Sequence, residues 1–410
     1  MLKQNRLRSA AIAAGLCLAV AGGSASAALP AEDSQGQPLP TLAPMLEKTV
    51  PSVVNIFTRT RVPQRQHPLL SDPFFRHFFE LPQQPRERYA QSLGSGVIVD
   101  GEQGYILTNH HVIDRAVEIS AHLADGRTLK AELVGSDPEA DVAVIKVEAQ
   151  NLTALPMADS DNLRVGDFVV AIGNPFGLGS SASSGMVSAL GRSGLGIEGY
   201  EDFIQTDASI NPGNSGGALV DLNGRLVGLN TAILSKSGGN MGIGFAIPIN
   251  MASEIMDQLI EFGEVRRGQL GAQAQDLTPE LAAAFDIENR RGAVVTQVTP
   301  DSPADKAGLK SGDVITSIDG QPVGDSADVH NAIGLLRVGE EVTITVQRNG
   351  DSETLTAVVE EPTVAKIKGE AIHKRLTGAV LGNIVKGIPI YGKTRGVLVL
   401  QVAPGSPAWS

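Results

Sequence analysis

Cysteine is nearly absent from this sequence of 410 residues, and so is any excess of positive charge. The single cysteine, Cys17, lies in an apolar segment near the start, so hydrophobic cores rather than disulfides must stabilise the domains. The 33 Lys and Arg are outnumbered by 45 Asp and Glu, and the net charge of −12 argues against a nucleic-acid-binding protein. No phosphate-binding loop, dinucleotide fingerprint or metal-ligand cluster is present in the sequence, so neither a cofactor nor a metal is expected.

The first 27 residues have the three parts of a secretory signal. Three basic residues precede an apolar run from Ala10 to Ala21, and the small residues Ala25-Ser26-Ala27 follow it. The run is shorter than the roughly 18 residues that span a membrane, which makes an anchor the weaker alternative. We therefore predict a signal peptide over residues 1–27, export of the chain, and a flexible leader over residues 28–44.

Short apolar segments separated by turn sequences begin near residue 45 and are typical of a β-barrel or sandwich. Only one convincing helix, Asn250–Phe262, closes this region. The pattern predicts a mainly β domain over residues 45–262, with a flexible Gly- and Ser-rich stretch at Gly173–Gly199. The predicted strands are Val53–Phe57, Gly96–Val99, Tyr105–Thr108, Asp141–Val147, Phe168–Ile172, Gly217–Val220 and Leu226–Leu229.

An internal repeat lies downstream of this region. The thirteen residues Gly292–Ala304 return as Gly396–Ala408, at an offset of 104 residues and with eight positions identical. The first copy continues into further helix and strand patterns, whereas the second stops at Ser410. A module that lacks about half of its strands cannot bury its apolar face. We expect a complete module over residues 266–362 and a truncated copy over residues 372–410.

The segment Asn211–Gly217 places one serine among small residues. Glycine lets the backbone approach a ligand closely, and the N–H groups of Gly213 and Ser215 can then hold a developing oxyanion. Alone, this pattern is as typical of a plain glycine-rich turn. A serine nucleophile also needs a base and an orienting acid, which His111 and Asp141 can supply. The order His, Asp, Ser, with gaps of 30 and 74 residues, is that of the chymotrypsin-type double β-barrel.

Several motifs, in this order, resemble the HtrA/Deg family of serine proteases. They are Thr108-Asn-His-His-Val, Asp141-Val-Ala-Val, Gly173-Asn-Pro-Phe-Gly-Leu, Gln205-Thr-Asp-Ala and Gly213-Asn-Ser-Gly-Gly-Ala, followed by PDZ-like modules. The resemblance covers nearly all of the chain after the signal. It implies a mainly β fold with a chymotrypsin-type double β-barrel protease domain, a PDZ domain (α+β) and a partial second PDZ domain. It also implies a homotrimer, or a larger assembly, that degrades or refolds misfolded envelope proteins without ATP.

The family motif assigns the nucleophile to Ser215, the base to His111 and the orienting acid to Asp141. The same motif makes Gly213, Asn214 and Ser215 the oxyanion hole. His110 is then a neighbour of the base rather than the base itself. The remaining histidines are expected to be surface or packing residues, and Asp137 and Asp159 to be turn residues.

The resemblance also implies a substrate pocket lined by Ile210, Ile233 and Leu234. Aliphatic walls without an acid favour small apolar side chains such as Val, Ala or Ile. The alternative is that these three residues are ordinary barrel core. Arg192 is, by resemblance, the contact residue of a loop that responds to the PDZ domain, and the alternative there is a merely mobile surface loop.

The segment from Arg267 to Ala272 resembles the carboxylate-binding loop of a PDZ domain. Peptide binding is expected at Gln269, Leu270, Gly271 and Ala272, whose backbone would hold a C-terminal carboxylate while the peptide adds as a β-strand. The alternative is a simple linker turn. The matching segment of the truncated copy is not expected to bind a peptide.

Together these features predict a periplasmic serine endopeptidase that degrades unfolded or misfolded envelope proteins under control of its PDZ domain. Two alternatives stay open at this point. One is a holdase chaperone or PDZ adaptor whose main activity is peptide binding. The other is a narrow regulatory protease that recognises one C-terminal signal.

Overall fold

The structure is a computed structural model that describes residues 41–62, 88–174, 179–211, 213–233, 241–284, 291–361, 366–384 and 396–409. The predicted signal peptide and all but the last four residues of the predicted leader lie outside these residues. Within the described part of the chain, no helix is both long and apolar enough to cross a membrane. By their contacts, residues 45–410 group into one unit.

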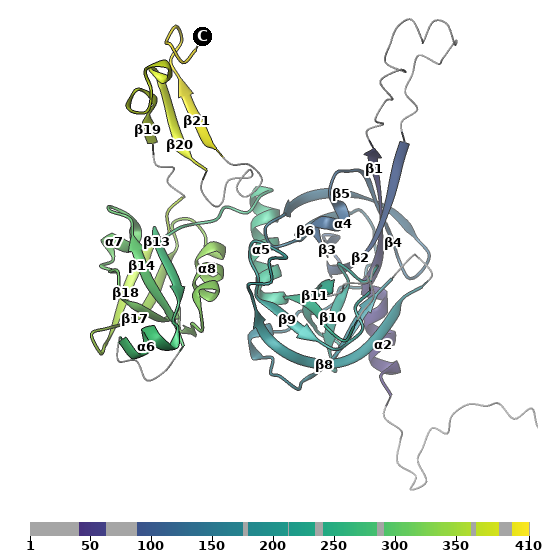
Figure 1. Cartoon of the computed structure of the whole chain (residues 1–410). Coiled ribbons are helices and arrows are strands. Elements are labelled where there is room, and N and C mark those ends of the chain that lie inside the picture. The colour runs from purple at the N-terminus through teal and green to yellow at the C-terminus, as the bar shows by residue number, and fades with distance from the viewer. Residues whose placement is uncertain are drawn as a thin grey trace, which may run out of the picture. The chain divides into compact units, whose positions relative to one another are not determined.

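The first half of the predicted β domain closes into a six-stranded antiparallel barrel (Figure 1), with the strand order β1-β2-β3-β6-β5-β4. The helix α2 (Ala43–Thr49) and the short turn η1 (Val50–Ser52) precede it. The strand β6 shows why the barrel forms, because all its residues except Lys146 are buried, as in a strand covered on both faces. The strands are β1 (Val53–Val62), β2 (Arg88–Asp100), β3 (Tyr105–Thr108), β4 (Ala116–His122), β5 (Thr128–Asp137) and β6 (Val142–Val147).

A second antiparallel barrel follows, with the order β10-β11-β12-β9-β8-β7. The helix α5 (Ile249–Phe262) comes directly after it and ends at Gly263, whose φ of 77° is the left-handed conformation of a helix C-cap. The strands are β7 (Phe168–Gly173), β8 (Ser181–Arg192), β9 (Phe203–Thr206), β10 (Ala218–Asp221), β11 (Leu226–Ile233) and β12 (Gly244–Pro248). The two barrels confirm the predicted chymotrypsin-type double β-barrel.

One expectation about the second barrel is wrong. The stretch Gly173–Gly199 was expected to be flexible from its glycine and serine content, but twelve of its residues form β8. The first half of this strand pairs with β7, from Phe168 opposite Met186 to Gly173 opposite Ser181, and its second half pairs with β9. Backbone pairing with these two strands therefore outweighs the weak strand propensity of the small residues in β8.

The complete PDZ module forms a sheet of order β13-β14-β15-β17-β18, with β16 (Gln321–Pro322) paired to β15. In β17, Val342, Ile344 and Val346 are buried and alternate with more exposed residues, as in a strand with one face on the core. The strands are β13 (Ala272–Asp276), β14 (Ala293–Val298), β15 (Val314–Ile318), β17 (Glu341–Arg348) and β18 (Asp351–Val358). The helices are α6 (Pro279–Ala284), α7 (Pro303–Lys306) and α8 (Ser326–Leu335).

The second copy of the repeat forms a three-stranded sheet, β19-β20-β21. Its elements are β19 (Lys366–Lys368), η5 (Gly369–Ala371), η6 (Lys374–Leu376), β20 (Ala379–Asn383) and β21 (Val397–Val402). The repeat makes a direct comparison possible, because Val295 in β14 and Val399 in β21 are equivalent. Val295 is 1 % exposed and Val399 is 61 % exposed. The sheet therefore lacks the cover that the complete module gives to the same position.

The turn between β2 and β3 offers a test of the first barrel. Gly104 has a φ of 76°, and a Cβ atom there would overlap the carbonyl oxygen of Val147. Gly104→Ala should lower the unfolding free energy of the protease domain by about 2 to 4 kcal/mol, from left-handed strain plus overlap. Gly126→Ala is the matched control, because Gly126 also has a positive φ but open space around it. Urea unfolding that shows equal losses for both variants would contradict the overlap.

Candidate active site

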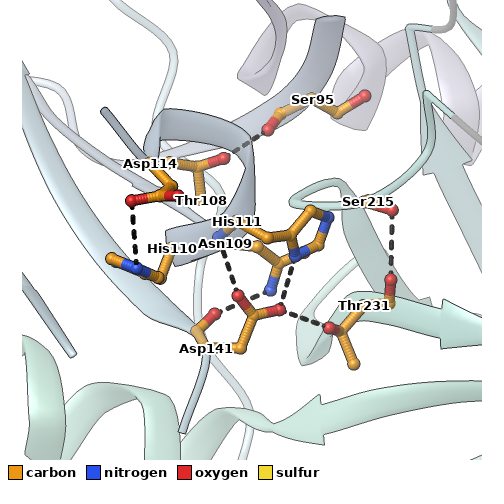
Figure 2. A network of polar contacts seen from close by, with 9 residues as sticks. All are labelled: Ser95, Thr108, Asn109, His110, His111, Asp114, Asp141, Ser215 and Thr231. Carbon is orange, nitrogen blue, oxygen red and sulfur yellow. Dashed lines mark hydrogen bonds and ion pairs between the residues drawn. The ribbon is translucent and has the colours of Figure 1, made fainter. Parts of the chain in front are cut away.

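His111 lies directly after β3, in the first turn of the short helix α4 (His110–Ile113). Its ring Nδ1 lies 2.7 Å from Oδ2 of Asp141, and its backbone N–H donates to Oδ1 of Asp141 at 2.9 Å (Figure 2). The His111 side chain is 51 % exposed, whereas the Asp141 side chain is 3 % exposed. The acid is therefore held inside the protein while the base reaches solvent, and a proton on Nδ1 leaves Nε2 as the acceptor.

Asp141 sits just before β6 with a φ of 55°, a left-handed conformation that Asp tolerates better than most residues. Its carboxylate also accepts a hydrogen bond from the Thr231 hydroxyl at 2.7 Å. Its carbonyl accepts from the Asn109 side-chain amide at 2.9 Å and from the His110 N–H at 3.2 Å. Thr231 lies on β11 of the second barrel, so both barrels hold the acid.

His110 makes different contacts, although it is adjacent to His111. Its Nδ1 lies 3.2 Å from the Ser136 hydroxyl, and its Nε2 lies 3.9 Å from a carboxylate oxygen of Asp114. Figure 2 shows its ring on the far side of Asp141 from Ser215. Of the two neighbouring histidines, only His111 is bonded to the Asp141 carboxylate in the described part of the chain.

Ser215 lies in a turn bounded by two glycines in the left-handed region, Gly213 with φ of 99° and Gly216 with φ of 79°. Its hydroxyl donates to the carbonyl oxygen of Thr231 at 3.0 Å. Asn214, which is buried, donates its N–H to the Asn211 carbonyl at 2.9 Å. Thr231 therefore contacts both Asp141, through its hydroxyl, and Ser215, through its carbonyl. Sequence reasoning missed Thr231, since no local pattern marks a threonine in the middle of a strand.

Of the three predicted pocket residues, the structure describes the side chain of Ile210 alone. Ile210 is 1 % exposed and belongs to the core of the second barrel. Ile233 is the last residue of β11, and nothing is described of its side chain, while Leu234 lies outside the described residues. The pocket assignment therefore stays a prediction for all three residues.

Arg192 ends β8 and leads into the segment 193–201. Its Nε donates to Oε1 of Gln205 on β9 at 2.9 Å. The carboxylate of Glu201 folds the following segment by accepting three backbone N–H groups, at 2.5 to 3.0 Å. The N–H groups of Gly199 and Tyr200 donate to the Glu139 carbonyl at 2.8 and 2.9 Å. A network of backbone hydrogen bonds thus shapes the segment after Arg192.

Arg267, at the start of the predicted peptide-binding loop, forms an ion pair with Asp137 at the end of β5. The exposed fractions of the two side chains are 8 % and 3 %. The Arg267 guanidinium lies 4.3 Å from the centre of the Tyr200 ring, and the Asn331 side-chain amide of α8 donates to the Glu201 carbonyl at 2.7 Å. Asp137 was expected to be a turn residue and is instead a buried ion-pair partner. The two residues are 130 positions apart, so no local sequence signal marks the pair.

The predicted peptide-binding residues occupy the approach to β13. Gln269 pairs with Glu360, its N–H donating to that carbonyl at 2.8 Å. Leu270 is 3 % exposed and packs in the PDZ core, and Gly271 has a φ of 78° that suits glycine. The Gln269 N–H is therefore already bonded within the module, and peptide binding at these four residues stays a prediction.

No group of three or more His, Cys, Asp or Glu able to hold a metal ion occurs among the described residues.

Comparisons with known proteins find a separate family match for each of the two main parts of the chain. The family of trypsin-like peptidase domains matches residues 94–229, and the PDZ domain family matches residues 268–359. The periplasmic pH-dependent serine endoprotease DegQ of Escherichia coli (strain K12) is 47 % identical over 414 residues, covering 100 % of this chain and 89 % of that protein. The periplasmic serine endoprotease DegP of the same organism is 44 % identical over 429 residues, covering 99 % and 89 %. A solved structure of the HtrA-type protease AlgW with a tripeptide is 45 % identical, with a TM-score of 0.62, and covers 80 % of this chain and 99 % of that one.

The acidic surroundings of Glu198 predict a pH dependence. Burial, followed by the negative charges of Asp141 and Glu201, raises the pKa of Glu198 to about 8, and Asp137 and Glu139 act in the same direction. A raised carboxyl pKa means that the folded state holds a proton that the unfolded chain has lost. The stabilising contribution of Glu198 is therefore complete below pH 4.5 and is lost as the pH rises through about 8.

Glu198→Gln has an uncharged side chain with the shape of the protonated Glu198. This variant should match the unchanged protein in melting temperature at pH 5 and exceed it at pH 9. Thermal unfolding across this range measures the difference. Glu148→Gln is the control, because Glu148 is an exposed carboxylate and its replacement should give no such widening gap. Parallel pH curves for the protein and Glu198→Gln would contradict the prediction.

Proposed function

The chain belongs to the HtrA/Deg family of serine endoproteases, and we propose that it cleaves unfolded or misfolded proteins in the periplasm with Ser215, His111 and Asp141 as its catalytic residues. The observation that carries the assignment is the pair of hydrogen bonds, at 2.7 and 2.9 Å, from His111 to the buried Asp141 carboxylate. They fix the tautomer and the orientation of the imidazole.

The proposed reaction follows from these contacts. The Ser215 hydroxyl turns from the Thr231 carbonyl to Nε2 of His111, which takes its proton as Oγ attacks the peptide carbonyl. Asp141 stabilises the imidazolium that forms. The N–H groups of Gly213 and Ser215 hold the oxyanion, and His111 then gives its proton to the leaving amine as the peptide bond breaks. Water, whose proton His111 accepts, next attacks the acyl carbonyl, and cleavage of the ester releases the acid product and restores the Ser215 hydroxyl. The chemistry needs no cofactor.

The PDZ module supports the proposal that peptide termini control the protease. An extended peptide would add to the free edge of β13, with its carboxylate bound by the N–H groups of Leu270, Gly271 and Ala272. The AlgW structures were solved with a tripeptide and a decapeptide, which agrees with a peptide-binding role for this module. Arg267 and Asn331 belong to the module and contact the segment after Arg192, which offers a physical link between the two sites.

The periplasmic location and the trimer are further proposals. The relatives DegP and DegQ are named periplasmic, and the predicted signal peptide agrees with that location. An apolar patch on the second barrel supports self-association, because Phe168 and Val165 are 63 % and 64 % exposed and Phe168 pairs across the sheet with the exposed Met186. A soluble protein exposes a group of this kind most often where a partner covers it.

Replacing the nucleophile tests the function. Ser215→Ala should reduce cleavage of an unfolded model protein by about 10⁴-fold or more, because the reaction then lacks its nucleophile. Cleavage is followed by electrophoresis and with a fluorogenic peptide. Ser209→Ala, at an exposed serine six residues before Ser215, is the control and should keep activity. A Ser215→Ala protein that suppresses aggregation while the unchanged protein also fails to cleave would favour the holdase alternative.

Replacing Phe168 tests the assembly. Phe168→Glu should convert trimers to monomers, because a charge in a buried contact is strongly unfavourable. Light scattering coupled to size-exclusion chromatography gives the mass. Val117→Glu, at a valine that is 57 % exposed on the first barrel, should leave the mass unchanged. A Phe168→Glu protein with the mass of the unchanged protein would exclude this patch as the subunit contact.

A further inference from the structure

Ser95 of β2 is a buried serine of the first barrel. Its polar groups form hydrogen bonds with the turn Gly213–Gly216 of the second barrel, which carries Ser215. Ser95 is 0 % exposed. Its N–H donates to the Ser215 carbonyl at 2.8 Å, and its hydroxyl donates to the Gly213 carbonyl at 2.7 Å. The same hydroxyl oxygen accepts the N–H of Asn174 at 2.8 Å. One side chain thus bonds the turn and the end of β7 together.

The two hydrogen bonds from Ser95 to the turn fix two of its peptide planes, one between Gly213 and Asn214 and one directly after Ser215. Since a peptide group is planar, the direction of the Gly213 carbonyl sets the whole plane between Gly213 and Asn214. The Ser215 carbonyl likewise sets the plane after Ser215. The peptide plane between Asn214 and Ser215 carries the Ser215 N–H, which is one of the two proposed oxyanion donors. The plane before Gly213 carries the Gly213 N–H, which is the other donor.

The turn needs such a constraint, because glycine flanks it on both sides. Gly213 and Gly216 have φ of 99° and 79°, and glycine crosses between backbone regions more easily than any other residue. The intrinsic preferences of the turn therefore do not hold its N–H groups in one direction. A partner outside the turn must supply the orientation.

Ser95 is itself held firmly enough to do so. Its carbonyl accepts the Thr108 hydroxyl at 2.7 Å, and the carbonyl of Asn174 accepts the Asn55 side-chain amide at 2.6 Å. A Cβ atom at Gly216 would overlap the Ser95 carbonyl oxygen, so the turn lies directly against β2. The hydrogen bonds of Ser95 to this turn are therefore part of the packed contact between the two barrels.

We propose that Ser95 is a positioning residue for the oxyanion hole. Its hydroxyl keeps the Gly213 carbonyl bonded toward the first barrel, so that the N–H groups of Gly213 and Ser215 stay aligned for the developing oxyanion. Without the hydroxyl, both the Gly213 carbonyl and the Asn174 N–H lose a buried partner, and the turn gains freedom to rotate. This inference rests on the proposed catalytic role of Ser215.

The test compares Ser95→Ala with the unchanged full chain on a fluorogenic peptide ending in valine before the cleaved bond. We expect kcat to fall about 10- to 100-fold with KM nearly unchanged, since the oxyanion forms only in the transition state. Affinity for a peptidyl-valine boronic acid, which mimics the tetrahedral intermediate, should fall by a similar factor. Binding of the uncleaved peptide to the double variant Ser95→Ala/Ser215→Ala should match its binding to Ser215→Ala alone.

Ser52→Ala is the matched control. Ser52 is also 0 % exposed, and its hydroxyl has no hydrogen-bond partner among the described residues, so the same substitution there should leave kcat unchanged. Ser95→Cys keeps a weak donor of similar size and should give an intermediate kcat, which preserves the test if Ser95→Ala folds poorly.

The outcomes separate the two proposals. Unchanged kcat in Ser95→Ala would overturn the positioning role. A lower kcat with unchanged boronic acid affinity, or with a matching rise in KM, would also overturn it, because the serine would then be merely structural. If Ser215→Ala cleaves as well as the unchanged protein, the proposed catalytic assignment fails instead.

Discussion

The proposed active site of this protease depends on one buried carboxylate. Asp141 is 2 % exposed, and a carboxylate taken out of water is strongly unfavourable unless donors surround it. The donors come from two directions: the backbone and the ring of His111 in the first barrel, and the hydroxyl of Thr231 in the second. The acid can be satisfied only when both barrels have closed and packed together. The proposed catalytic arrangement is therefore coupled to the fold, and a chain that has not assembled its barrels has not assembled this arrangement either.

The same principle extends outward from the site. Asp137 lies at the end of β5, four residues before Asp141, and its buried carboxylate is paired with Arg267 of the PDZ module. A buried ion pair contributes little net stability, but loss of one partner strands the other charge. The Arg267 guanidinium also lies over Tyr200, next to Glu201, whose carboxylate folds the segment after Arg192. The proposed peptide-binding loop beside Arg267 and the segment after Arg192 thus share one set of contacts, through which the proposed PDZ control would act.

Much of the fold was predictable because the signals are local. β3 was predicted to the residue by its run of mostly apolar side chains, and the helix α5 was predicted to within one residue. β8 was missed because its small residues have weak strand propensity, and the pairing with β7 and β9 decides its conformation. His111, Asp141 and Ser215 were selectable because each lies in a short motif beside an apolar strand. Thr231, Asp137 and Ser95 carry no such mark.

The residue types available for chemistry, the order His, Asp, Ser, the family and the mainly β class can all be inferred from the sequence, since they depend on motifs a few residues long. How those residues are held follows from the packing of the barrels. The tertiary structure paired Asp141 with Thr231 across 90 residues, Asp137 with Arg267 across 130, and Ser95 with Gly213 across 118. The physical reason is that hydrogen bonds and ion pairs of buried groups form between whichever segments the barrels bring together. Sequence spacing does not encode that proximity, whereas closing and packing the barrels creates it.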